Sequence, residues 1–254
     1  MRWQVVRECD FCGSRDTAPF LKIATPNWYD GRALELSQCV DCNLVRATPR
    51  PERRDLYRDE LIGTTKLVPI VQKKLARPNL MASQRRLVEV VTGAARRPVR
   101  RLYEFGCGVG TVLMAARTLG IEAEGNDVNL VSIRMLTGLG FRVRHGFTSE
   151  LDFQGMQFDA VMSVAYLQES YEPFGDLKRS FELLAPGGAI YIKSAYLGCP
   201  EHRASGEAWR AFGAGNFHYF YPETLRAMVE TAGFNVLDMR LHGMATVLLA
   251  GREI

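Results

Sequence analysis

The second half of the chain alternates short apolar runs with amphipathic stretches, and this alternation most limits the possible fold. Apolar runs such as residues 101–105, 121–127 and 158–167 are separated by segments of helical spacing, two of which end at Gly120 and Gly140. Strands separated by helices of about 10–15 residues are typical of βαβ units, which build a parallel sheet with its ligands at the carboxyl ends of the strands. We therefore predict an α/β fold around such a sheet.

A glycine-rich turn follows the first of these strands, within the stretch RLYEFGCGVGTVL at residues 101–113. Backbone N–H groups in such a turn favour a nucleotide or an anion. The third glycine, Gly110, comes one residue too early for a dinucleotide fingerprint, and no Gly-Lys-Ser/Thr follows as in a P-loop. A bound pyrophosphate is therefore not the best prediction. Asp127 ends the next strand about twenty residues on, where an acidic side chain binds ribose hydroxyls, and Glu104 could meet a cationic part of the ligand.

Four motifs in unbroken order resemble those of class I S-adenosylmethionine-dependent methyltransferases. They are EFGCGVG at 104–110, EGNDVN at 124–129, FDAVMSV at 158–164 and LLAPGGAIYI at 183–192. The resemblance implies an enzyme with a Rossmann-like, seven-stranded, mostly parallel sheet whose last strand is antiparallel. It also implies S-adenosyl-L-methionine as the cofactor. The cofactor contacts that it implies are Glu104, Gly106, Cys107, Gly108, Gly110, Asp127, Val128, Phe147, Thr148 and Ser163.

Two CxxC pairs, CDFC and CVDC, lie near the N-terminus. In a chain without a secretion signal this layout favours a metal over disulfides. Each pair is followed by a residue that tolerates positive φ, Gly13 and Asn43, which suits a turn around a metal. The segment resembles the zinc ribbon that precedes many bacterial class I methyltransferases. We predict one closed structural zinc site, with free thiols or two redox pairs as the alternative, formed by Cys9, Cys12, Cys39 and Cys42.

These features divide the chain into three expected regions. They are a zinc ribbon at residues 1–50, a linker and helices covering the core at 51–98, and the methyltransferase domain at 99–254. Within the second region, residues 66–75 and 79–95 have the spacing of helices. No run of about 18 apolar residues and no signal-peptide pattern occurs, so we expect a cytoplasmic protein without a membrane partner.

Candidate catalytic residues lie in two segments that follow the fourth and fifth strands, at 163–170 and 197–223. The second segment is a long aromatic loop, which favours a lid or a substrate wall. Its passage NFHYFYPETL resembles the one before the last helix of the family, so His218 is the first candidate for a general base. Glu169 and Tyr166 are the next candidates, as base or as acceptor contacts. A structural role is the alternative for each of the three.

The expected reaction is methyl transfer to a small-molecule acceptor, most simply to an oxygen of a sugar or a secondary metabolite. An RNA methyltransferase that uses the zinc ribbon for RNA binding is the alternative, because the formal net charge is +4 and short basic clusters occur. Against it, no N/D-P-P-Y/F motif follows the fourth strand. A non-enzymatic zinc-ribbon adaptor is a further alternative, disfavoured by the intact glycine turn and Asp127. The sequence does not predict an oligomeric state.

Overall fold

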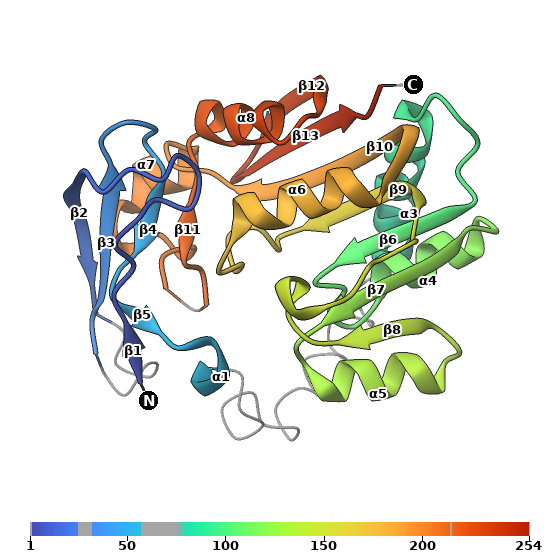
Figure 1. The fold of residues 1–254 in the computed structure, drawn as a ribbon, viewed down its shortest axis with the longest axis horizontal. Helices are drawn as coiled ribbons and strands as arrows, with labels where there is room; N and C mark the ends of the chain where they lie inside the picture. The colour runs from blue at the N-terminus through green and yellow to red at the C-terminus, as the bar shows by residue number, and fades with distance from the viewer. Residues whose placement is uncertain (1, 25–31, 57–76, 78, 214, 254) are drawn as a thin grey trace.

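The computed structural model describes residues 2–24, 32–56, 77, 79–213 and 215–253. Seven strands form one sheet in the order β12-β13-β10-β9-β6-β7-β8 (Figure 1). Their bounds are β6 Arg101–Phe105, β7 Glu122–Asp127, β8 Arg142–His145, β9 Phe158–Val164, β10 Leu184–Ala195, β12 Asn235–His242 and β13 Ala245–Gly251. The strands from β6 to β10 are parallel, and β13 runs antiparallel between β10 and β12. The predicted Rossmann-like sheet with an antiparallel last strand is thus confirmed.

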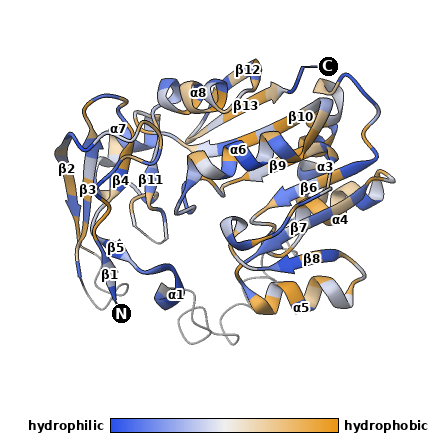
Figure 2. Ribbon diagram, in the orientation of Figure 1, coloured by the Kyte–Doolittle hydropathy of each residue, from blue (hydrophilic) through white to orange (hydrophobic). Residues whose placement is uncertain are grey.

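Helices cover both faces of this sheet and supply its two apolar cores. On one face lie α3 (Leu80–Ala94), α4 (Thr111–Thr118) and α5 (Leu130–Gly138), and on the other lie α6 (Pro173–Leu183) and α8 (Pro222–Thr231). Figure 2 shows hydrophobic residues along the central strands β9 and β10, which match their almost continuous burial. Parallel strands that are buried on both faces have this composition. The described helices include none that is long and apolar enough to cross a membrane.

Two details of the sequence prediction differ from the structure or lie outside its described part. The sequence predicts the fifth strand at residues 189–196, in AIYIKSAY, but the strand begins earlier, because Leu184 already pairs with Phe158 before a bulge leads to Ala189. The helix predicted at 66–75 falls outside the described residues.

A second, antiparallel sheet of four strands lies toward the carboxyl ends of the large sheet (Figure 1). Its strands, in spatial order, are β11 (His218–Tyr219), β4 (Val45–Ala47), β3 (Leu34–Cys39) and β2 (Thr17–Ile23). Strand β11 comes from the long loop after β10, and His218 pairs with Arg46 of β4. The N-terminal region and this loop therefore share one sheet.

The aromatic loop also contains α7 (Pro200–Ser205) and a 3₁₀ turn at Gly206–Ala208. Trp209, Phe217 and Tyr219 are buried in an apolar cluster with Leu34 and Val45 of the small sheet. The loop thus supplies much of that sheet's core, which its sequence alone did not indicate.

The proline- and arginine-rich segment after the small sheet has regular structure, although the sequence suggests a linker. Strand β5 (Arg50–Pro51) pairs with β1 (Trp3–Gln4), and the short helix α1 (Arg53–Leu56) follows it. The partner strand lies far back in the chain, so a local pattern could not reveal the pairing.

Candidate active site

A cavity of ≈ 290 Å³ opens at the carboxyl ends of β6, β7, β8 and β9. This is the edge at which parallel α/β sheets bind their ligands. Its volume is near the lower end of the range for small-molecule sites. Its walls come from the glycine turn after β6, from residues 126–129 at the end of β7, from residues 146–149 after β8, and from residues within 165–172 after β9.

The glycine turn brings bare backbone to the cavity wall. Gly106 and Gly108 have φ values of 63° and 52°, which favour glycine. A Cβ atom at Gly106 would come within 2.5 Å of Cδ2 of Tyr166, whereas a Cβ atom at Gly108 would have no neighbour within 4 Å. The space above Gly108 belongs to the cavity, so a ligand can approach the turn closely there.

Asp127 lies at the end of β7 and lines the same cavity. Its carboxylate accepts hydrogen bonds from the backbone N–H groups of Gly108 and Asn129, each at 2.8 Å. Burial raises the pKa of Asp127, while these two N–H donors act in the opposite direction. A carboxylate fixed in this way beside an open glycine turn fits the hydroxyls of a ribose, as the sequence predicts.

The cavity gathers some of the predicted cofactor residues and not others. Those that line it are Gly106, Gly108, Asp127, Val128, Phe147 and Thr148. Those that lie outside its described lining are Glu104, Cys107, Gly110 and Ser163. Glu104 and Ser163 are buried within β6 and β9, and a Cβ atom at Gly110 would clash with Leu136. Cofactor contacts stay predictions for all ten residues, and the cavity brings six of them together.

A chain of oriented hydrogen bonds crosses the cavity floor from β7 to α6. Asn126 donates to Oγ1 of Thr148 at 3.3 Å, and Tyr166 donates its hydroxyl to Oδ2 of Asp176 at 2.7 Å. The 2.7 Å bond between Thr148 and Tyr166 then has Thr148 as its donor, because the tyrosine proton is already used. The hydroxyl of Ser170 donates a second hydrogen bond to the same oxygen of Asp176, at 2.5 Å.

Burial has the largest effect on the pKa of both titratable groups in this chain of hydrogen bonds, Tyr166 and Asp176. It raises the pKa of Asp176 and raises the pKa of Tyr166 well above its ordinary value, with the negative charge of Asp176 adding to the second shift. Tyr166 therefore keeps its proton near neutral pH, whereas Asp176 moves toward the range in which a carboxylate acts as a base. No sequence motif singled out Asp176, which faces Tyr166 only because α6 packs beside β9.

The predicted base residues occupy different places. Tyr166 and Glu169 line the cavity, and His218 lies behind its wall, outside the described lining. The fully buried imidazole of His218 donates from Nδ1 to the carbonyl oxygen of Ser170 at 2.9 Å, and its Nε2 has no hydrogen-bond partner among the described residues. Burial lowers the pKa of His218 well below its ordinary value, and the charges of Arg50 and Arg46 act in the same direction. The imidazole is therefore neutral at pH 7.

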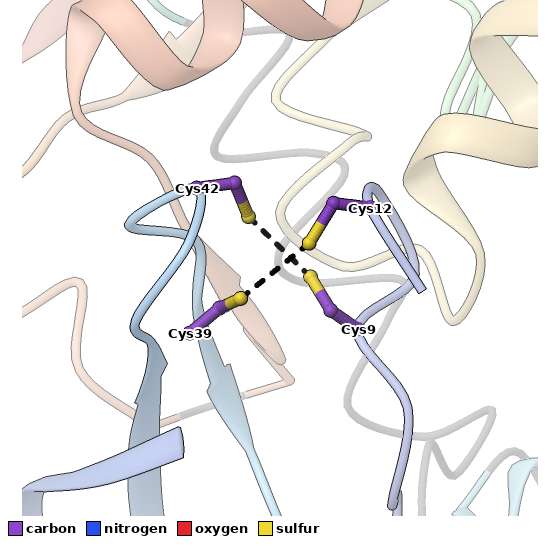
Figure 3. Close-up of side chains that lie close together, drawn as sticks. All are labelled: Cys9, Cys12, Cys39 and Cys42. Carbon is purple, nitrogen blue, oxygen red and sulfur yellow. Dashed lines mark hydrogen bonds between the residues drawn. The ribbon is translucent and has the colours of Figure 1, made fainter. Parts of the chain in front are cut away.

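The four cysteines of the two CxxC pairs converge from two turns (Figure 3). Their sulfur atoms all lie within 4.8 Å of one another, and the Cys9–Cys42 and Cys12–Cys39 pairs are each 3.5 Å apart. Four thiolates around a tetrahedral zinc would be about 3.8 Å apart, so the cluster fits a structural zinc. The residue after each turn has positive φ, 73° at Gly13 and 62° at Asn43, and this confirms the predicted turn geometry.

Comparisons with known proteins agree with this architecture. A family model described as a methyltransferase domain matches residues 76–239. The ubiquinone biosynthesis O-methyltransferase of Ruegeria pomeroyi is 33% identical over 94 residues, which are 35% of this chain and 38% of that protein. The protein of the same name from a second Ruegeria species is 28% identical over 154 residues, which are 55% of this chain and 62% of that protein. The chain thus spans less than two thirds of the length of these relatives.

Solved structures share the fold at low sequence identity. The CcbJ methyltransferase from Streptomyces caelestis has a TM-score of 0.54 at 16% identity, covering 73% of this chain and 96% of its own. An S-adenosylmethionine-dependent methyltransferase from Clostridium acetobutylicum has a TM-score of 0.55 at 12% identity, covering 75% and 99%. Because the family model covers more than half of the sequence, the chain belongs to the class I S-adenosylmethionine-dependent methyltransferases.

Proposed function

We propose that the enzyme methylates a hydroxyl oxygen of a small, uncharged or cationic acceptor, such as a sugar or a secondary metabolite. The observation that carries this proposal is the charge of the cavity. Four carboxylates line it, Asp127, Glu169, Glu172 and Asp176, against the single described cation Arg53. Such a lining attracts the positively charged sulfonium and ammonium groups of the cofactor and repels a phosphate or carboxylate acceptor.

The acceptor class has support from the relatives and from the enclosure of the site. Both curated relatives are O-methyltransferases by name. The rings of Tyr166 and Tyr171 line the part of the cavity that follows β9, where an apolar or sugar ring can pack. An RNA methyltransferase would need cationic side chains for the phosphates around its target, and the described wall offers only Arg53.

In this proposal the bound cofactor would supply the electrophilic methyl group. Residues of the chain orient the acceptor and remove its proton. Gly106, Gly108 and Asp127 would hold the cofactor, and the acceptor's hydroxyl proton would go to a nearby base as its oxygen takes the methyl group and adenosylhomocysteine is left. Asp176 fits this role because it lines the cavity and its pKa is raised. Glu169 remains the second candidate and Tyr166 a hydrogen-bonding contact. His218 supports the wall through Ser170 in this proposal.

Two assays test this function. The enzyme is incubated with methyl-labelled cofactor and either a set of neutral polyhydroxylated and phenolic compounds or total RNA. We expect label in the small molecules at an oxygen and none in the RNA, and nuclease-sensitive label in RNA would contradict the proposal.

The role of Asp176 is tested with Asp176→Asn, which preserves shape. We expect turnover to fall by about 10²–10⁴-fold because proton transfer is lost, and cofactor affinity to fall far less because three carboxylates of the cavity remain. Glu169→Gln is the matched comparison, and a larger loss there would move the base to Glu169.

A further inference from the structure

Arg53 connects the N-terminal region to the methyltransferase cavity. Among the described residues that precede the glycine turn, it alone lines the cavity. It begins the short helix α1, which follows strand β5. The sequence predicted only a linker at this position.

The side chain of Arg53 touches both sides of the cavity mouth. On one side, its Nη1 donates to Oγ of Ser149 at 2.6 Å, and its guanidinium carbon lies 4.9 Å from the ring centre of Phe147. On the other side, its Nη2 pairs with Oε1 of Glu172 at 2.6 Å, and the guanidinium carbon lies 5.3 Å from the ring centre of Tyr171. Arg53 thus bridges the loop after β8 and the loop after β9, all four partners being cavity residues.

The backbone that carries Arg53 is fixed by separate contacts. Arg50 is buried and donates to the carbonyl oxygen of Tyr171 at 3.0 Å, and the hydroxyl of Tyr171 donates to the carbonyl oxygen of Pro51 at 2.8 Å. Closer to the cysteine cluster, Asp10 accepts the backbone N–H of Phe174 at the start of α6. The segment therefore stays in place when only the Arg53 side chain is shortened.

We propose that Arg53 is a positioning residue that closes the cavity over the bound cofactor, so that the N-terminal region forms part of the cofactor site. It holds Phe147, one of the predicted cofactor contacts, and fixes Glu172 across the mouth. A planar guanidinium can stack on a ring and donate two directed hydrogen bonds together, which an ammonium cannot do. Cofactor release then requires these contacts to break or move.

The test measures the affinity and dissociation rate of adenosylhomocysteine, the reaction product of the cofactor, by calorimetry and stopped flow with the full chain. We expect Arg53→Ala to weaken binding by about 10-fold and to accelerate dissociation, because it removes a charged hydrogen bond and a cation–π contact. Arg53→Lys should restore part of the affinity. Arg54→Ala is the matched control, because Arg54 is exposed on the same short helix and should bind as the wild type.

Glu172→Gln checks the same contact from the opposite loop. Because the Glu172 side chain is half exposed, we expect a smaller loss of about 2–3-fold. Unchanged affinity and dissociation rate in Arg53→Ala would overturn the proposal, and so would an equal loss in Arg54→Ala. The assay contains no acceptor, so its outcome is independent of the acceptor chemistry proposed above.

Discussion

The two larger sheets of this molecule are stabilised in different ways. The seven-stranded sheet consists of consecutive βα units, and its strands bury apolar side chains on both faces. The four-stranded sheet has short strands, takes one of them from the loop after β10, and buries Arg46 and His218 opposite each other. A sheet this small requires help beyond its apolar core, and the cysteine cluster and the aromatic loop provide it.

This difference separates the tasks of the two regions. The large sheet forms the predicted cofactor end of the cavity from its own loops, with Gly106, Gly108 and Asp127 in the wall. The N-terminal region carries Arg53 to the mouth just after β5, which pairs with β1, and the small sheet places His218 behind the wall. We expect damage to the small sheet to act first on stability and damage to the large sheet's loops to act first on binding.

The largest expected effect follows from removing a cysteine ligand. Cys39→Ser should abolish stoichiometric zinc and destabilise the N-terminal region strongly, because a structural zinc contributes on the order of 10 kcal/mol to folding. Metal analysis and limited proteolysis of residues 2–56 measure both outcomes. Cys199→Ser is the control, since Cys199 lies outside the cluster. Equal zinc content and equal proteolysis in both variants would show that the small sheet does not depend on metal.

In the large sheet, Asp127→Ala should weaken binding of the cofactor. Two ribose hydroxyls would lose a charged acceptor, so we expect cofactor affinity to fall by about 100-fold. The free energy of unfolding should change little by comparison. Calorimetry with adenosylmethionine measures the affinity, and affinity equal to that of the wild type would remove Asp127 from the cofactor site.

Gly106→Ala should lower stability and binding together. The new Cβ would lie 2.5 Å from Tyr166, and φ is positive, so we expect a loss of about 1–3 kcal/mol. Gly120→Ala is the matched control, because Gly120 also has positive φ but no neighbour within 4 Å of the added atom. Urea unfolding should show a larger loss for Gly106→Ala, and equal losses would assign the effect to backbone conformation alone.

The smallest effect concerns the pH dependence of the small sheet. The pKa of His218 is depressed in the folded state. The unfolded chain therefore binds a proton on this imidazole as the pH falls through about 6.5, whereas the folded chain does not. Stability is therefore lost as the pH falls below about 6.5. Relative to His218→Asn, the wild type should lose on the order of 1 kcal/mol between pH 7 and pH 5.5. If the unfolding free energies of the wild type and His218→Asn changed equally with pH across this range, His218 would not be a buried neutral imidazole.

Much of the cofactor end could be predicted because its signals are local. Gly106 and Gly108 adopt positive φ, and Asp127 ends a strand. These local requirements select residue types that can be recognised in the sequence at a fixed spacing. The CxxC turns are equally local, and Gly13 and Asn43 have the predicted conformation. The part of the cavity proposed to bind the acceptor has no such local pattern in the sequence. Asp176 lies inside helix α6 with no motif around it, and its contact with Tyr166 exists only once α6 packs beside β9.

By itself, the sequence determined the βαβ order, the glycine turn and the cysteine pairs, since each follows from periodicity or from backbone conformation over a few residues. Only the tertiary structure decided that β11 joins β4, that His218 is buried behind Ser170, and that Arg53 reaches the cavity mouth. These contacts join segments that are far apart along the chain. They depend on how whole elements pack, which no local pattern encodes.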